Sequence, residues 1–213
     1  MKSHRPVIGI LGAGKLGTVL AQLFIKANYP VYIAGSGDAT KIALSIKILT
    51  PGAIAVSASE AIAQADVILL ALPLSKYKTL PAKLLKGKLV VDAMNYWWEV
   101  DGNMPELKST TSSEMVQAYL KGARVVKALS HMGYHNVFDD NRPHDSLDRK
   151  AIAIAGDNSA DTALVSKLVD DIGFDPVTIG RLSAGKFLEP GNPMFGASVT
   201  ASDIHNLLPS ILE

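Results

Sequence analysis

Three glycines near the start of the chain stand at a spacing that suits a diphosphate. Gly12, Gly14 and Gly17 form the pattern G-x-G-x-x-G directly after the apolar run 7–11. Glycine permits a sharp turn from strand to helix, close approach of a ligand to the main chain, and tight packing of helix on strand. The first N–H groups of the following helix would face the diphosphate. We therefore predict a dinucleotide site, and the other residues expected to contact the cofactor there are Ala13, Lys15 and Leu16.

The residues that follow the second apolar run favour NADP over NAD. Enzymes that use NAD usually carry an acidic residue there, which binds the ribose hydroxyls and would repel the extra phosphate of NADP. This chain has Ser36 and Gly37 instead, with Lys41 one turn further on, and we expect the first acid, Asp38, to be a helix N-cap. A serine hydroxyl and a lysine ammonium can both bind a phosphate. We predict NADP as the cofactor, with contacts from Ser36, Gly37 and Lys41.

Two later strand ends offer further cofactor contacts. In an open parallel sheet, ligands bind outside the carboxyl ends of the strands. We expect Ala71, Leu72 and Pro73 to lie against the adenosine or the nicotinamide ribose, and Asn95 to hydrogen-bond the carboxamide or the ribose. Each of these residues, taken singly, is equally compatible with an ordinary role at a strand end or in a turn.

The candidates for acid–base chemistry follow the sixth apolar run. If the substrate is a carbonyl or an imine, a donor must protonate the developing anion, and His131, Tyr134 and His135 are the groups to test. Hydride transfer to a flavin or deazaflavin would need alignment and exclusion of water rather than an acid. The structural alternative for these side chains is a solvated polar loop, and we predict a long loop over 132–149. We predict no metal, because the Glu of an H-E-x-x-H motif is absent and Gly133 weakens a helix there.

The elements that must position these residues alternate between strand and helix. Nearly continuous apolar runs predict strands that are covered on both faces, in a Rossmann-type doubly wound, mostly parallel α/β sheet. The glycine motif lies between a predicted strand and a predicted helix, which disfavours the alternative of a chance turn. We divide the chain into an NADP-binding domain, 1–123, and a C-terminal α/β extension, 124–213, which is either a separate unit or a continuation of the same sheet. The predicted strands are 7–11, 31–34, 53–56, 67–72, 89–93, 125–129, 151–155 and 176–179, and the clearest helices are 18–27, 162–172 and 202–212, the last with Ser202 as its N-cap.

The composition limits the class of protein, the partners and the cellular compartment that we expect. The 213 residues are 48% hydrophobic, enough to bury a core, and a formal net charge of +1 without a basic stripe argues against nucleic acid as a partner. The chain has no cysteine, which excludes disulfides and thiolate metal sites and fits a reducing compartment. We find no run long and apolar enough to span a membrane or act as a signal peptide, and expect a cytoplasmic protein.

The aromatic stretch Tyr96-Trp97-Trp98 contains both tryptophans of the chain. We interpret it first as a hydrophobic anchor beneath a loop or at a subunit contact. The alternative is an aromatic wall against a planar ring.

Eight short blocks along the chain resemble those of the NADP oxidoreductases that act on the deazaflavin coenzyme F420. That resemblance implies a small dinucleotide-binding fold, often dimeric, in which the nicotinamide of NADPH faces a flavin or deazaflavin ring. Members of the family usually carry Lys-x-Phe-Asn where this chain has Lys127-Ala-Leu-Ser130, so the acceptor stays open. Two alternatives remain: an NADPH-dependent reductase of a small carbonyl or imine, and a non-catalytic module that senses NADP(H). The blocks are 9–17, 34–36, 70–73, 90–95, 125–128, 155–157, 172–177 and 188–190.

Overall fold

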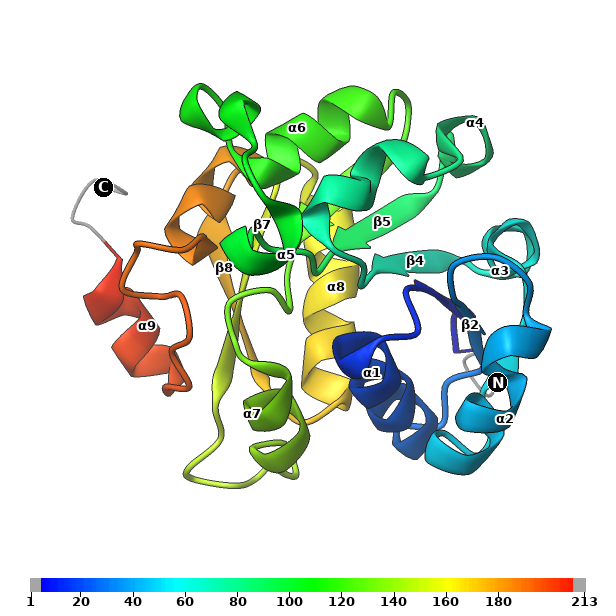
Figure 1. Ribbon diagram of the computed structural model, residues 1–213. Helices are drawn as coiled ribbons and strands as arrows, with labels where there is room; N and C mark the ends of the chain where they lie inside the picture. The colour runs from blue at the N-terminus through cyan, green and yellow to red at the C-terminus, as the bar shows by residue number, and fades with distance from the viewer. Residues whose placement is uncertain (1–4, 209–213) are drawn as a thin grey trace.

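The computed structural model describes residues 5–208 and contains one eight-stranded sheet (Figure 1). Its strand order is β3-β2-β1-β4-β5-β6-β7-β8, and neighbouring strands are parallel except for the antiparallel pair β6 and β7. The predicted doubly wound, mostly parallel fold is therefore confirmed. The strands are β1 (Ile8–Leu11), β2 (Val31–Ala34), β3 (Ile54–Ala55), β4 (Val67–Leu70), β5 (Leu89–Asp92), β6 (Arg124–Lys127), β7 (Ala151–Gly156) and β8 (Asp175–Gly180).

Helices cover both faces of the sheet because its strands are apolar on both faces. In β4, Val67 and Leu69 belong to the core beneath α1 and α8, whereas Ile68 and Leu70 belong to the core beneath α3 and α6. This alternation follows the two-residue period of a strand. The helices are α1 (Lys15–Lys26), α2 (Thr40–Leu49), α3 (Ala58–Gln64), α4 (Ala82–Leu85), α5 (Trp98–Asp101), α6 (Ser112–Tyr119), α7 (Tyr134–Asp139), α8 (Ser159–Asp171) and α9 (Ala201–Leu207), with 3-10 turns η1 (Leu74–Thr79), η2 (Pro105–Lys108) and η3 (Leu182–Leu188).

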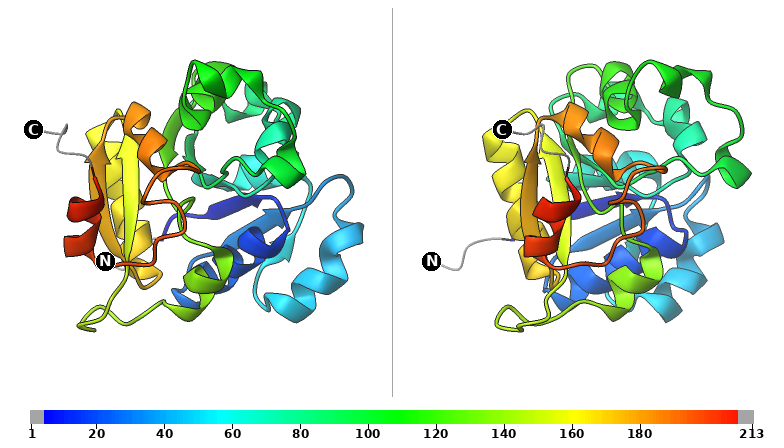
Figure 2. Two further views of the ribbon diagram at one scale, coloured as in Figure 1. Left: turned by 60° about the vertical axis from the view of Figure 1, so that its left-hand side comes forward. Right: turned by 90° about the vertical axis from the view of Figure 1, so that its left-hand side faces the viewer.

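A third core cluster fills the outer end of the sheet. Residues of β7 and β8 pack there against η3 and α9, which lie beside these strands in both views of Figure 2. The division expected after residue 123 falls between β5 and β6, which pair with each other in the one sheet.

Within residues 5–208, no helix combines the length and the apolar character needed to cross a membrane.

Five strands end in register, and this alignment positions the candidate site. Leu11 pairs with Ala34 on one side and with Leu70 on the other, Leu70 pairs with Asp92, and Asp92 pairs with Lys127. The segments that follow β1, β2, β4, β5 and β6 therefore all leave the sheet at one edge, which is where an open parallel sheet binds its ligand.

Three local expectations were wrong in detail. The loop expected over 132–149 contains α7, which buries Val137 and is preceded by Gly133 at the N-cap, where glycine costs little. The N-cap of α9 is Thr200 rather than Ser202, because Thr200 forms a capping box with Asp203; the expected end of that helix at 212 lies outside the described residues.

The third of these expectations concerned Asp38. The residue at the N-cap of α2 is Ala39, although the Asp38 carboxylate does accept hydrogen bonds from the backbone N–H of Thr40 at 2.8 Å and from its hydroxyl at 2.7 Å. These bonds lower the pKa of Asp38. Asp38 therefore stabilises the first turn of α2 from the position before the N-cap, rather than from the N-cap itself.

Candidate functional site

The three glycines of the motif differ in what surrounds them. Gly12 has φ +121°, and a side chain at Gly12 would clash with the backbone carbonyl of Ala71. A side chain at Gly17 would clash with the Gly12 carbonyl, so this glycine permits α1 to pack on the strand end. A Cβ at Gly14 would meet no atom within 4 Å. Two glycines are therefore required by packing, and the third lies where a ligand has room to approach.

The N-terminus of α1 is open to a ligand at the same point. Its N-cap is Gly14, which offers no side chain to bind the first N–H groups of the helix. Lys15 is exposed beside them. A helix of 12 residues carries a partial positive charge at its N-terminus, and together with these N–H groups it forms a suitable site for a diphosphate.

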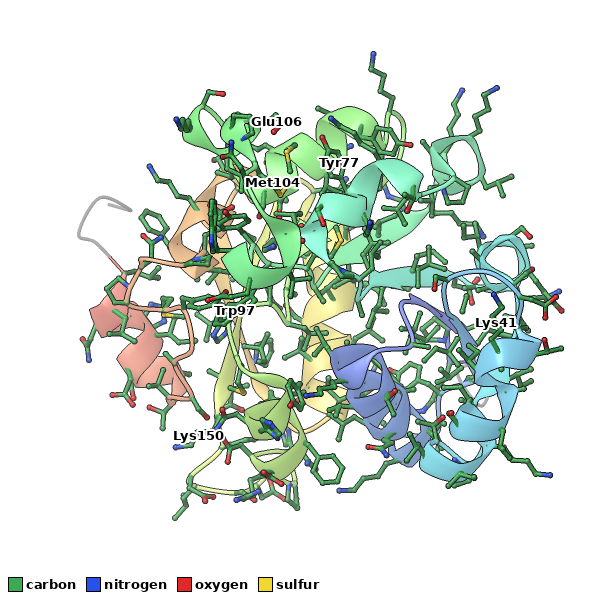
Figure 3. All side chains as sticks on the ribbon, viewed as in Figure 1. Lys41, Tyr77, Trp97, Met104, Glu106 and Lys150 are labelled. Atoms are coloured by element: carbon green, nitrogen blue, oxygen red, sulfur yellow. The ribbon has the colours of Figure 1, made fainter. Side chains whose placement is uncertain are left out.

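Ser36, Gly37 and Lys41 gather at the end of β2. Gly37 has φ +93°, and a Cβ there would lie 3.8 Å from the Nζ of Lys41, so the lysine bends back over the turn. All three residues are exposed. In Figure 3, α1 lies between Lys41 on the right and Trp97 on the left. A hydroxyl and an ammonium group at this turn suit an additional phosphate.

The segment after β4 lies directly beside the glycine loop. The Ala71 N–H donates to the Leu11 carbonyl at 2.8 Å. Ala71 and Leu72 are partly buried, and Pro73 is exposed at the same edge. The main chain of Ala71 and Leu72 thus adjoins Gly12, on the side where the sequence predicts a bound dinucleotide.

Asn95 has an amide group that is already engaged with the protein. Its Nδ2 donates to the carbonyl of Leu188 at 2.7 Å and to that of Ser130 at 3.2 Å, and its Oδ1 accepts from the Tyr96 N–H at 3.0 Å. Both amide hydrogens are thereby used. The side chain joins three segments at the strand ends, which leaves one lone pair of Oδ1 for the ligand contact that we expected.

His131 lies in the packed core rather than on a solvated loop. It is 1% exposed, and its Nε2 accepts a hydrogen bond from the Ala153 N–H at 3.1 Å. Burial lowers the pKa of His131 to about 4, so that the imidazole is neutral near pH 7. A buried, neutral imidazole that is engaged by the backbone is poorly placed to protonate a substrate. The structure therefore argues against the catalytic role expected for His131.

Tyr134 and His135 begin α7 close to the N-terminus of α1. The Lys15 Nζ lies 5.2 Å from the centroid of the Tyr134 ring, and the rings of Tyr134 and His135 have centroids 3.9 Å apart. Tyr134 is partly buried and His135 is exposed. Both polar side chains therefore lie beside the predicted diphosphate site, within the part of the site that is open to solvent.

The aromatic stretch after β5 lies partly in solvent. Trp97 is 52% exposed, and its ring stacks on Phe195 with centroids 6.3 Å apart. The N–H of Trp97 donates to Asp101, whose other carboxylate oxygen accepts from the Ser75 N–H, each at 2.8 Å. Tyr96 also lines a hollow of about 300 Å³, together with Asn103, Met104, Leu107, Lys108, Glu189 and Pro190, none of which is a predicted cofactor residue.

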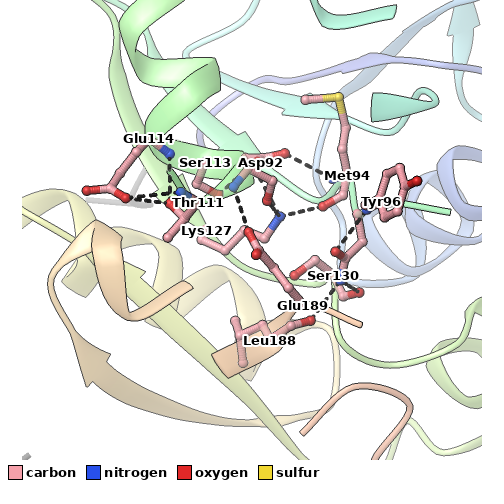
Figure 4. Close-up of polar contacts among 12 residues, drawn as sticks. Asp92, Met94, Tyr96, Thr111, Ser113, Glu114, Lys127, Ser130, Leu188 and Glu189 are labelled. Carbon is pink, nitrogen blue, oxygen red and sulfur yellow. Dashed lines mark hydrogen bonds and ion pairs between the residues drawn. The ribbon is translucent and has the colours of Figure 1, made fainter. Parts of the chain in front are cut away.

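A buried ion pair at the strand ends was missed by sequence reasoning (Figure 4). The Lys127 Nζ lies 3.3 Å from Asp92 Oδ2, and both side chains are fully buried. Each lies at the end of its strand, where a charged residue interrupts an apolar run. That interruption was the available signal, because a charge that ends a buried strand needs a partner. Within residues 5–208, no three His, Cys, Asp or Glu side chains are arranged to hold a metal ion.

Comparison with known proteins gives a family match over the first part of the chain. Residues 7–96 match the model of the family described as NADP oxidoreductase coenzyme F420-dependent. The Escherichia coli K12 protein YjhV is 35% identical over 72 residues, a match that spans 33% of this chain and 53% of that relative. The chain thus matches about half the length of this curated relative.

Solved structures extend the similarity to nearly the whole chain. Protein SMa0349 from Sinorhizobium meliloti is 27% identical, with a TM-score of 0.81 over 92% of this chain and 95% of that chain. A candidate F420-dependent NADP reductase from Arthrobacter sp. FB24 is 20% identical, with a TM-score of 0.72 over 85% of this chain and 87% of that one. A reductive aminase from Aspergillus terreus, solved with NADPH and ethyl levulinate, is 17% identical, with a TM-score of 0.59 over 84% of this chain and 56% of that one. The match to the family described as NADP oxidoreductase coenzyme F420-dependent is thus confined to residues 7–96, whereas the similarity in fold extends over nearly the whole chain.

Proposed function

We propose that this protein binds NADPH along the edge where β1, β2, β4 and β5 end, and transfers hydride to a planar acceptor of the flavin or deazaflavin type. The observation that carries the proposal is the open space at Gly14, directly at the N-terminus of α1. The family match over residues 7–96 supports NADP as the cofactor. Bound NADPH would supply the hydride.

The chain's own residues would bind and orient the cofactor. The N–H groups at the start of α1 and the exposed Lys15 would neutralise the diphosphate. Ser36 and Lys41 would bind the 2′-phosphate, which NADH lacks. Leu72 and Pro73 would exclude water along one side of the cofactor, and Asn95 would contact the carboxamide or the ribose through its remaining lone pair.

The acceptor would lie beside Trp97. This half-exposed ring, held against Phe195, offers a flat face for a planar acceptor, and hydride transfer between two rings depends on alignment rather than on a protein acid. A carbonyl or imine substrate is the second candidate. It is favoured by the position of Tyr134, whose hydroxyl could donate a proton, with His135 beside it.

The test measures loss of the reduced-nicotinamide absorbance for NADPH and NADH in parallel, without oxygen, with flavins, the deazaflavin and simple carbonyl compounds as acceptors. We expect NADPH to be consumed in preference to NADH with a flavin-type acceptor. Consumption with a carbonyl alone, abolished by Tyr134→Phe, would favour the second candidate. Tight NADPH binding without turnover with any acceptor would contradict both proposals and favour a sensing module.

We also propose, from the family resemblance and the absence of cysteine, that the protein acts as a homodimer in the cytoplasm. Sedimentation equilibrium tests the assembly directly. A mass of one chain, about 23 kDa, at micromolar concentration would contradict the homodimer.

A further inference from the structure

We propose that Lys127 is a positioning residue, whose buried pair with Asp92 holds the segment 94–98 in one geometry at the acceptor side of the site. The purpose assigned to this geometry, alignment of Trp97 with an acceptor, rests on the proposed function. The geometric claim itself, that the ion pair determines how Asn95 and Trp97 are held, does not depend on it.

The ion pair is the centre of a polar network inside the protein (Figure 4). The Lys127 Nζ lies 3.3 Å from Asp92 Oδ2, donates to the Met94 carbonyl at 2.5 Å, and lies 3.3 Å from the Ser112 hydroxyl. The Ser113 hydroxyl donates to the same Asp92 oxygen at 2.7 Å. The network therefore joins the ends of β5 and β6 to the first turn of α6.

Both backbone polar groups of Met94 belong to this network. Its carbonyl accepts from Lys127, and its N–H donates to Asp92 Oδ1 at 3.0 Å. The next residue, Asn95, connects to Ser130 and Leu188 through its amide. An unbroken series of contacts thus leads from the ion pair to the residue two positions before Trp97.

A second observation at the end of β6 indicates that this region is held firmly. Leu129, two residues after Lys127, has φ +62°, in the left-handed region that residues other than glycine seldom adopt. Such a conformation persists only where its surroundings enforce it, and such residues are common at functional sites. Here the following carbonyl, that of Ser130, is held by Asn95, which is itself next to the anchored Met94.

Stability gives little reason to keep a buried ion pair. Burial of two charges costs about as much as their attraction returns, and an apolar pair of similar volume often stabilises a fold equally well. Buried pairs have been retained in some proteins because they specify a single arrangement. The position of this pair, at the ligand edge of the sheet and beneath the segment that carries both tryptophans, favours that explanation here.

The test uses the two tryptophans, Trp97 and Trp98, as reporters of the segment. The double variant Asp92→Asn with Lys127→Met removes both charges and so avoids an unpaired charge in the core. Its near-ultraviolet circular dichroism, which reports fixed aromatic packing, should fall by about half, while the far-ultraviolet signal is kept. The matched control is Arg124→Met with Asp161→Asn. This double variant removes another ion pair of β6, in which the Arg124 Nε lies 2.9 Å from Asp161 Oδ2 and the Arg124 side chain is about half exposed.

Kinetics supplies the second readout. If the double variant is active, we expect kcat to fall about tenfold or more, with the Kd for NADPH changed by less than about threefold, because misplacement of a positioning group affects alignment more than binding. The control pair should leave the tryptophan signal, kcat and Kd unchanged.

Three results would overturn the proposal. The first is a folded double variant with an unchanged tryptophan signal, and the second is an equal loss of signal in the control pair. If the double variant does not fold, the single variant Asp92→Asn decides: it removes the ion pair and keeps the size of the side chain, and an unchanged tryptophan signal there would be the third contradiction. Because circular dichroism is measured without NADPH or acceptor, failure of the proposed reaction and failure of this inference are separate outcomes.

Discussion

At the residue scale, the discrimination that we propose between NADPH and NADH depends on two exposed side chains after β2. Ser36 and Lys41 are not supported by an arginine, and Asp38 nearby is turned toward Thr40. The phosphate contact would therefore be made largely by one ammonium group and one hydroxyl.

We predict that Lys41→Ala raises the Kd for NADPH by about tenfold to a hundredfold, because a hydrogen bond to a charged group contributes about 1.5–3 kcal/mol. The Kd for NADH should be unchanged, since NADH lacks the 2′-phosphate. Titration calorimetry with both nucleotides measures this difference. Lys47→Ala, an exposed lysine in the last turn of the same helix, is the control, and an equal effect of both substitutions would contradict the assignment.

His131 contributes to a second property, the response of stability to acid. Burial lowers its pKa from 6.5 to about 4 in the folded protein, so below pH 6.5 the unfolded chain binds a proton that the folded chain does not. Stability is therefore full above pH 6.5 and is lost as the pH falls from 6.5 toward 4, by up to about 3 kcal/mol from this residue.

In His131→Gln, whose side-chain oxygen can still accept from Ala153, we expect a smaller decrease in the free energy of unfolding between pH 7 and pH 4.5. Urea unfolding at several pH values measures it. His205→Gln, an exposed histidine on α9, should retain the wild-type slope. If the free energy of unfolding fell equally with pH in the wild type and both variants, His131 would not contribute to the loss of stability in acid.

At the element scale, the junction of β1 and α1 separates the packing and binding roles of the glycines. Gly17 contacts the strand end, whereas Gly14 adjoins open space. The same substitution at these two positions should therefore have different consequences, although the sequence motif treats them alike.

We predict that Gly17→Ala destabilises the protein by about 1–3 kcal/mol or more, because the added carbon overlaps the Gly12 carbonyl. Gly14→Ala should change stability by less than about 1 kcal/mol, because there is room for its side chain. It should nevertheless weaken NADPH binding about tenfold, by occupying the space next to the first N–H groups of α1. Thermal unfolding together with NADPH titration distinguishes the two, and a strongly destabilised Gly14→Ala would contradict the structure.

At the scale of the whole molecule, a polar contact connects the N-terminal part of the chain to the end of α8. The Tyr29 hydroxyl donates to Asp171 Oδ2 at 2.5 Å, and the Arg5 guanidinium lies 3.0 Å from the same oxygen. Arg5 also lies over the Tyr29 ring, 4.6 Å from its centroid. This contact joins the start of β2 to the end of α8, 142 residues later in the sequence.

Burial, with the hydrogen bond to Asp171, raises the pKa of Tyr29 from 10 to about 12. Stability from this residue is thus full below pH 10 and is lost as the pH rises from 10 to 12, because the unfolded tyrosine ionises first. We expect Tyr29→Phe to cost about 1–2 kcal/mol near pH 7 and to reduce that alkaline slope. Unfolding at pH 7 and pH 11 measures both effects, with Tyr32→Phe as the control; a slope identical to the wild type in Tyr29→Phe would contradict the assignment.

What the sequence by itself determined was local. All eight apolar runs are strands, and the glycine motif joins a strand to a helix, because the strand period, the helix period and the conformational freedom of glycine depend on near neighbours. The family resemblance agreed with the match over residues 7–96. The gathering of Ser36, Gly37 and Lys41 also followed from sequence, since these residues occupy one short turn.

The tertiary structure decided what depends on residues far apart. Asp92 and Lys127 are 35 residues apart, and only the pairing of β5 with β6 shows that their charges meet in the core. His131 is a polar residue in a polar stretch, and its burial follows from the contact with β7, which the sequence does not reveal. The antiparallel direction of β7 is equally nonlocal. A side chain's burial and partners depend on which elements pack together, whereas its local conformation depends on its neighbours in the chain.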